Sequence, residues 1–122
     1  MHIVLAIFFI LHGIAHPVGF AGSWNLGEAG RKAHATTILG GRIALGERGI
    51  RALGLLWIPC ALAFIAAAVL VFLGRRESFG VAMGAAIASA VMCILYWPAA
   101  RIGLFLNLII MALVIFRPGA PQ

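Results

Sequence analysis

The sequence predicts an all-α membrane protein, a bundle of four transmembrane helices in a single domain. Of its 122 residues, 64% are hydrophobic and only 10% are charged, which is not the composition of a soluble domain. Four charge-poor segments follow one another, and clusters containing arginine separate them. Each of the first three is long enough to cross about 30 Å of hydrocarbon at about 1.5 Å per helical residue. The predicted spans are residues 3–21, 50–73, 79–97 and 98–116.

The first span carries a proline and two histidines. We expect its helix to run regularly from about residue 3 to His16, because Pro17 disfavours helical geometry in the residue before it and leaves the Gly13 carbonyl without a partner. His12 and His16 stand one helical turn apart and flank this weak point. The face that they share carries Phe9, His12, His16 and Phe20.

Residues 22–50 form the only sizeable connection, and they are rich in glycine. Glu28, which basic residues follow closely, predicts a short surface helix with local ion pairs. Residues 37–45, with Gly40 and Gly41 at their centre, predict a short β-hairpin. Because an isolated hairpin is marginal in water, we expect it to lie on the helix ends or the membrane surface and to cap the bundle.

Proline and small residues shape the second and third spans. The second helix should begin near Gly46 or Glu47 and bend at Pro59. Each of these spans also has a row of small side chains, which lets membrane helices pack closely. The rows are Gly54, Ala61 and Ala68 in the second span, and Gly80, Gly84 and Ala88 in the third. We expect the third-span row to contact another copy of the chain or a partner membrane protein.

The charged residues indicate orientation and partners. All nine lysine and arginine residues lie in connections or at helix ends. The first and third connections hold six of them and the opposite side holds three, so the positive-inside rule places both termini outside the cytoplasm. The net charge of +6 suits anionic lipid headgroups. We expect no nucleic-acid partner, because no basic surface alternates with exposed aromatic residues.

Motifs of known chemistry are missing from the sequence. It contains no nucleophile triad, P-loop, dinucleotide fingerprint or pair of in-membrane carboxylates, so only histidine could serve in a proton relay within the spans. Cys60 and Cys93 lie in apolar spans without CxxC spacing, which indicates buried, inert thiols.

The histidine pair therefore carries the functional hypotheses. Imidazole is costly to bury in hydrocarbon unless it has a partner. In a structural role, one ring would bond the Gly13 carbonyl that Pro17 frees, and the other would bond a polar side chain of a later span. The candidate partners are Asn107, Ser89 and Tyr96.

The alternatives to a structural role are a pocket for a lipophilic ligand or haem, and a metal site. His12 and His16 share a face from which both could reach one metal, or one could be an axial haem ligand. Further metal ligands would have to come from the first connection, where His34, Glu28 and Glu47 have no diagnostic spacing. The candidate ligand-binding residues are His12, His16, Asn107, Tyr96 and Ser89.

Three functions remain open at this stage. The first is a binding or accessory module that holds a quinone, lipid or haem near the histidine pair. The second is a small membrane isomerase or oxidoreductase that acts on an apolar substrate, with histidine as general acid/base or haem ligand. The third is a purely structural subunit of a membrane complex.

Several short motifs resemble a group of small bacterial four-span membrane proteins, loosely of the DoxX type, some of which carry the label transporter permease. The similar segments are His12-Gly13-Ile14-Ala15-His16, the connection from Gly41-Arg42 to Gly46-Glu47, Gly54-Leu55-Leu56-Trp57, and Trp97 to Gly103 followed by Asn107. The resemblance implies a four-helix fold with a long first connection, located in the bacterial cytoplasmic (inner) membrane as a multi-pass protein. It implies no reaction and no catalytic residue.

Overall fold

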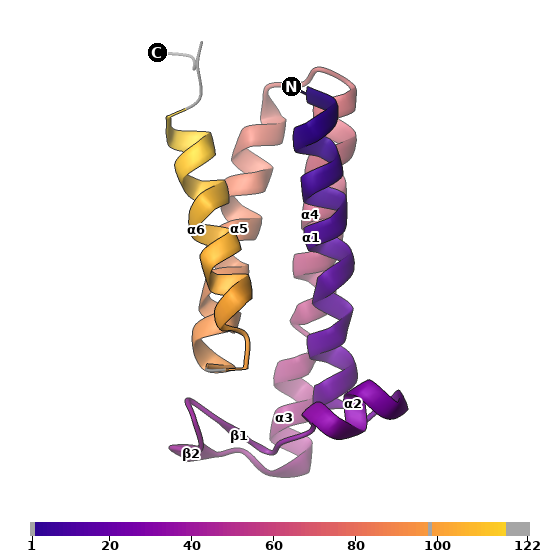
Figure 1. Ribbon diagram of the computed structural model, residues 1–122, viewed down its shortest axis with the longest axis vertical. Coiled ribbons are helices and arrows are strands. Elements are labelled where there is room, and N and C mark those ends of the chain that lie inside the picture. The colour runs from indigo at the N-terminus through magenta and orange to yellow at the C-terminus, as the bar shows by residue number, and fades with distance from the viewer. Residues whose placement is uncertain (1, 98, 117–122) are drawn as a thin grey trace.

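The computed structural model describes residues 2–97 and 99–116, and it confirms the all-α class with a short hairpin. The body of the described chain consists of α1 (His2–Ser23), α4 (Trp57–Phe72), α5 (Glu77–Leu95) and α6 (Arg101–Ile115), which lie lengthwise in one bundle (Figure 1). α1 packs on α4, α4 on α5, and α5 on α6. α1 and α6 therefore lie at the two ends of this row, where they have little direct packing.

Within the described residues, three helical segments are long and apolar enough to cross a membrane. They are Ile3–Ser23, Gly46–Phe72 and Glu77–Leu95. The fourth predicted span is shorter than expected, because α6 has 15 residues and begins at Arg101. At about 1.5 Å per residue, such a helix covers only about 22 Å. Pro98, the predicted start of this span, lies outside the described residues.

The prediction that the first helix ends at His16 is wrong, since α1 continues through Pro17 to Ser23. A proline inside a helix removes one backbone hydrogen bond, and close packing on a neighbouring helix can compensate for that loss. α1 has such packing at Gly13, where a Cβ atom would lie 3.1 Å from the Ala61 carbonyl oxygen. Contact with α4 therefore holds α1 helical on both sides of the proline.

The second span is interrupted, as Pro59 predicts. It consists of α3 (Gly46–Gly54) and α4, and Leu55 and Leu56 lie between them. Pro59 has no N–H to donate to the Leu55 carbonyl, which instead accepts from the Ile58 amide at 3.2 Å. The helix thus breaks one turn before the proline.

The two rows of small residues face different surroundings. Gly54, Ala61 and Ala68 are buried, which confirms close helix packing along the second span. In the third span, no atom outside the helix backbone lies within 4 Å of a Cβ built on Gly80 or Gly84. This second row lies on the outer surface of the bundle, and its contact with another chain stays a prediction.

The first connection folds as the sequence predicts. α2 (Gly27–Ala33) is a short helix in which Lys32 lies 3.8 Å from Glu28. β1 (Thr37–Ile38) pairs antiparallel with β2 (Ile43–Ala44) across a turn whose glycines have φ angles of +65° and +89°. The backbone amides of Leu39 and Gly40 donate to the carbonyl oxygens of Leu95 and Trp97, each at 2.8 Å. These bonds place the hairpin on the end of α5, near the start of α6 (Figure 1).

Candidate functional site

Four of the predicted polar residues meet inside the bundle. His12 and His16 of α1 are only 6% and 4% exposed, and Ser89 of α5 and Asn107 of α6 are fully buried. His12 Nε2 lies 2.8 Å from Asn107 Oδ1, and His16 Nε2 lies 2.6 Å from Ser89 Oγ. Asn107 Nδ2 donates to Ser89 Oγ at 2.8 Å, which joins the two pairs. One hydrogen-bonded network therefore links three helices.

The His12 carbonyl oxygen and a neutral His16 ring together determine the proton positions in this network. His16 Nδ1 lies 2.8 Å from the His12 carbonyl oxygen, which can only accept, so Nδ1 carries the proton. A neutral His16 ring then has a lone pair on Nε2, and the Ser89 hydroxyl must donate to it. Ser89 Oγ is thereby free to accept from the Asn107 amide nitrogen. The Asn107 oxygen faces His12, so His12 Nε2 must be the donor of the last bond.

This assignment makes the two histidines unequal. Both ring nitrogens of His16 have partners, whereas a neutral His12 with its proton on Nε2 has a lone pair on Nδ1. That nitrogen is buried and has no hydrogen-bond partner. The remaining surroundings of the ring are aromatic: Phe8 stacks at 6.2 Å and Phe64 meets it edge-on at 4.7 Å between ring centroids.

The predicted bond from the pair to a polar side chain of a later span is confirmed at Asn107 and Ser89, but the predicted bond to the Gly13 carbonyl is wrong. Neither histidine bonds the Gly13 carbonyl, because a helical side chain points back along its own helix and His16 reaches the carbonyl four residues earlier, that of His12. Tyr96, the third candidate partner, bonds a different residue. Its hydroxyl lies 2.6 Å from Ser23 Oγ, about two helical turns along α5 from Ser89.

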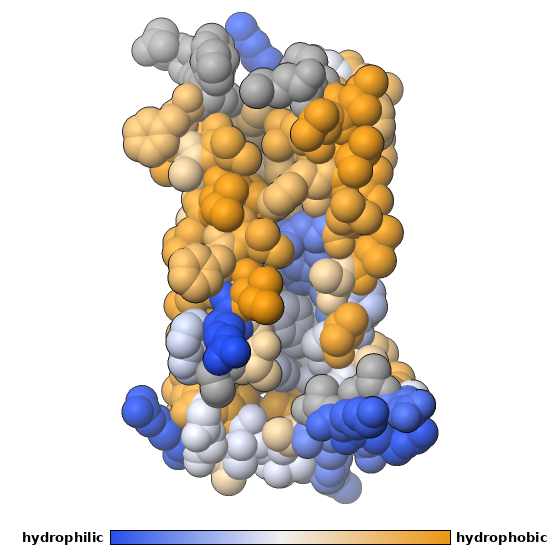
Figure 2. Space-filling model, in the orientation of Figure 1, coloured by the Kyte–Doolittle hydropathy of each residue, from blue (hydrophilic) through white to orange (hydrophobic). Residues whose placement is uncertain are grey.

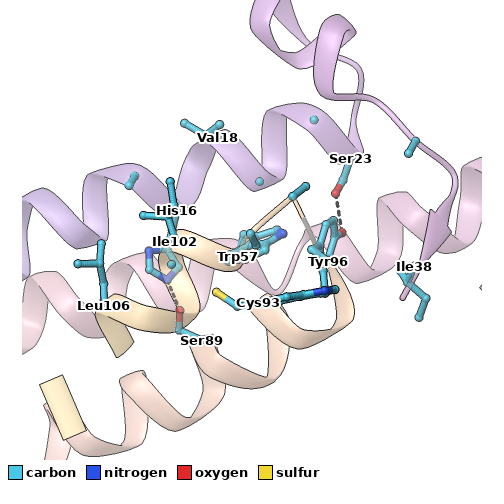
Figure 3. A pocket seen from close by; sticks show the side chains of 18 of the residues that line it. His16, Val18, Ser23, Ile38, Trp57, Ser89, Cys93, Tyr96, Ile102 and Leu106 are labelled. Atoms are coloured by element: carbon cyan, nitrogen blue, oxygen red, sulfur yellow. Dashed lines mark hydrogen bonds between the residues drawn. The ribbon is translucent and has the colours of Figure 1, made fainter. Parts of the chain in front are cut away.

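A cavity of about 790 Å³ adjoins the network, and all five candidate residues except Asn107 line it. Figure 3 shows His16 and Ser89 in one part of the wall, the Ser23–Tyr96 pair in another, and Trp57 between them. Trp57 contacts both neighbours edge-on, with ring centroids 5.4 Å from His16 and 5.2 Å from Tyr96. Trp57 and Ser23 are thus site residues that the sequence does not single out.

The cavity opens between α1 and α6. Ala15 and Val18 of α1 and Ile102 of α6 line it and are also exposed at the surface of the bundle. Figure 2 shows the hollow between two apolar rims, with more hydrophilic surface at its base. The hairpin contributes Ile38 and its glycine turn to the other end of the lining.

Polar contacts at the hairpin end hold the first connection against the helix ends of the bundle. His34 Nδ1 donates to the Gly22 carbonyl oxygen at 2.7 Å, and His34 Nε2 lies 2.8 Å from Glu47 Oε1. The hydrogen bond to Glu47, and next the one to Gly22, raise the pKa of His34 above its usual value of 6.5. Trp24 Nε1 donates to the Arg51 carbonyl oxygen at 2.9 Å, and the Arg51 guanidinium lies 5.3 Å from the Trp24 ring centroid.

The site chemistry does not favour a metal or haem. In the part of the chain that the structure describes, no three His, Cys, Asp or Glu side chains come together as a metal-binding group. Metal and haem iron both need an imidazole nitrogen with a free lone pair. His16 has none, and His12 has only Nδ1, the nitrogen nearer to its own backbone. Among the residues that the structure describes, no lysine or arginine lines the cavity to neutralise haem propionates.

Comparison with known proteins does not identify the chain. No family model, curated protein or solved structure matches the chain. The resemblance to DoxX-type membrane proteins therefore stays a prediction.

Proposed function

We propose that the protein binds a membrane-resident amphiphile, such as a quinone or a lipid, in the cavity between α1 and α6. In this role it is a multi-pass binding or accessory module of the bacterial cytoplasmic membrane. The observation that carries the proposal is the cavity itself, which has apolar walls and a polar hydrogen-bonded network beside it. Its volume of about 790 Å³ lies within the range of about 300 to 1,000 Å³ that is typical of small-molecule sites.

Entry from the bilayer follows from the surfaces around the opening. Val18 and Ile102 at the rim are 61% and 71% exposed, and Leu11 and Phe105 nearby on the same helices are 64% and 66% exposed. A surface of this kind is stable against lipid chains but not against water. The hairpin covers the end of the cavity where the basic connection lies, so an apolar molecule enters sideways between α1 and α6.

Photolabelling in liposomes tests the proposal. A long-chain alkyl diazirine, which carries no polar head of its own, should label peptides that contain the cavity wall more strongly than the outer face of α4. Replacing Ala15 with phenylalanine fills the opening and should reduce labelling of the wall several-fold. Ala66→Phe is the matched control, because Ala66 is equally an exposed helical alanine but does not line the cavity.

Two results would contradict the proposal. One is labelling spread evenly over all lipid-facing helices. The other is equal labelling of the wall in the Ala15→Phe and Ala66→Phe variants, which would mean that the cavity does not hold the probe.

A further inference from the structure

We infer that the cavity selects an anionic glycerophospholipid, whose acyl chain lies between α1 and α6 and whose phosphate lies outside the mouth, beside Arg42 and Arg101. This inference rests on the proposed function and names the class of lipid. The apolar cavity receives the chain of the lipid, and the two arginines at its edge receive the charged head.

The two arginines adjoin the lining of the cavity from different elements. Arg101 is the first residue of α6, and Ile102, which follows it, lines the cavity and forms part of its rim. Arg42 follows Gly41, which lines the cavity from the turn of the hairpin. Both arginines are exposed. Their guanidinium groups can therefore meet a lipid head at the mouth without entering the cavity.

A backbone hydrogen bond brings these two elements together. The Gly40 amide donates to the Trp97 carbonyl oxygen at 2.8 Å. Arg42 lies two residues after the donor and Arg101 four residues after the acceptor, so both belong to one corner of the molecule. Trp97 also lines the cavity and is 44% exposed, and tryptophan favours the level of the lipid headgroups. This corner lies at the hydrophilic base of the hollow in Figure 2.

Neither arginine has a carboxylate partner in the described part of the chain. The sequence contains three acidic residues, and each of them is engaged elsewhere. The pairs are Glu28 with Lys32, Glu47 with His34 and Arg51, and Glu77 with Arg75. A phosphate at the mouth would therefore meet two unpaired guanidinium groups, which bind phosphate oxygens through charge-assisted hydrogen bonds.

The inner wall of the cavity suits an acyl chain. Its polar side chains already bond one another, and the pairs are His16 with Ser89 and Ser23 with Tyr96. His12 Nδ1 and Trp57 Nε1 have no partner, but they are buried beneath the wall, where a ligand does not touch them. An acyl chain needs no hydrogen bond, so it fits a wall of this kind.

The depth of the cavity separates the chain from the head. The lining follows α1 from Ser23, near the hairpin end, to His12, eleven residues and about 16 Å farther along the helix. A phosphate carried to that depth would lose its hydration, and the described lining offers no lysine or arginine in return. At the mouth the phosphate keeps its water and gains the two arginines.

Two photoreactive lipids with the same diazirine-bearing acyl chain test the inference, namely phosphatidylglycerol and phosphatidylcholine. Each is added in trace amount to liposomes of unlabelled phosphatidylcholine that contain the protein. We expect phosphatidylglycerol to label peptides of the cavity wall about fivefold more strongly, the factor that about 1 kcal/mol of attraction to one arginine supplies. Excess glycerol 3-phosphate in the buffer should leave this labelling unchanged, because it has no chain to place in the cavity.

Two double variants with the same change in charge separate the mouth from the rest of the basic end. Arg42→Gln with Arg101→Gln removes both arginines of the mouth, and the preference for phosphatidylglycerol should fall to less than about twofold. Arg31→Gln with Arg48→Gln is the control. These two arginines of α2 and α3 are also exposed and without an ion pair among the described residues, but they do not adjoin the cavity lining. The control should keep the preference.

The outcomes distinguish this inference from the proposed function. If the alkyl diazirine labels the wall but the two phospholipids label it equally, the headgroup preference is overturned and the lipid-binding cavity stands. An equal fall in both double variants overturns the assignment to Arg42 and Arg101, because the charge of the whole end then attracts the lipid. Displacement by glycerol 3-phosphate overturns a lipid as the ligand of these arginines. Absence of selective labelling by the alkyl diazirine overturns the proposed function, and the inference with it.

Discussion

Replacing Asn107 with leucine should lower the free energy of unfolding by about 2 to 4 kcal/mol. The Asn107 side chain is fully buried, and its amide bonds His12 of α1 and Ser89 of α5. A hydrogen bond between membrane helices contributes about 0.6 kcal/mol on average and about 1.7 kcal/mol at most. The variant loses these two and the weak bond from Asn107 Nδ2 to Cys93 Sγ at 3.6 Å, and the orphaned His12 Nε2–H adds about 1 to 3 kcal/mol. Leucine has the branched shape of asparagine and is larger, so the substitution creates no cavity.

The assay is reversible unfolding in mixed micelles with increasing SDS, followed by tryptophan emission. Trp57 reports on the network, because its ring centroid lies 5.4 Å from that of His16. Leu108→Ala is the control on the same helix, since Leu108 is 51% exposed, and it should change stability by less than about 0.5 kcal/mol. A loss in Asn107→Leu no larger than in this control would refute the conclusion that the network holds α1, α5 and α6 together.

A double variant checks the cause of the loss. Asn107→Leu combined with His12→Phe removes both partners of one hydrogen bond and leaves no orphaned N–H between them. The loss of stability in the double variant should then be smaller than the sum of the losses in the two single variants, by about 1 kcal/mol or more. Strict additivity would mean that the ring and the amide do not interact, against the 2.8 Å contact between them.

Two further predictions concern the edges of the site. The pKa of His34 is raised in the fold, so its protonated bond to Glu47 stabilises the protein fully below about pH 6.5 and is lost as pH rises through the higher folded pKa. The melting temperature in detergent should therefore fall between about pH 6 and about pH 9, and His34→Gln should abolish this pH dependence. Gly19→Ala should lower the free energy of unfolding by about 1 to 3 kcal/mol and shift tryptophan emission, because its Cβ would lie 2.5 Å from Trp57 Cε2. Gly80→Ala, whose Cβ would have nothing within 4 Å, should leave stability unchanged, and equal melting temperatures of the two variants would contradict this packing.

The helices could be predicted from composition, but their ends depended on tertiary contacts. Pro17 and Pro59 look alike in the sequence, since each removes one hydrogen bond from an apolar helix. Only Pro59 accompanies a break in the observed helix. At Pro17 the chain stays helical, because Gly13 allows α1 to approach the Ala61 carbonyl of α4 closely. That approach joins residues far apart in the sequence, so no local pattern predicts it.

The site could be predicted in part for a similar reason. His12, His16, Ser89 and Asn107 are polar residues in apolar helices, and hydrocarbon drives such groups together. Tyr96 has the same chemistry but lies about two turns beyond Ser89, where Ser23 is nearer. The roles of Ser23, Trp57 and the hairpin depend on how residues 22–50 fold back over the helix ends. Such a path is set by bonds like that of the Leu39 amide to the Leu95 carbonyl, which have no sequence pattern.

The histidine pair also shows why a structural role and a binding role need not compete. Three of the four ring nitrogens bond protein atoms, and two of these bonds connect α1 to α5 and α6. The same bonds fix which nitrogen of His12 carries the proton, so the network orients the one nitrogen that it does not use. A rigid polar network beside an apolar cavity is what a selective site requires, because a wall that could rearrange would accept a donor and an acceptor equally.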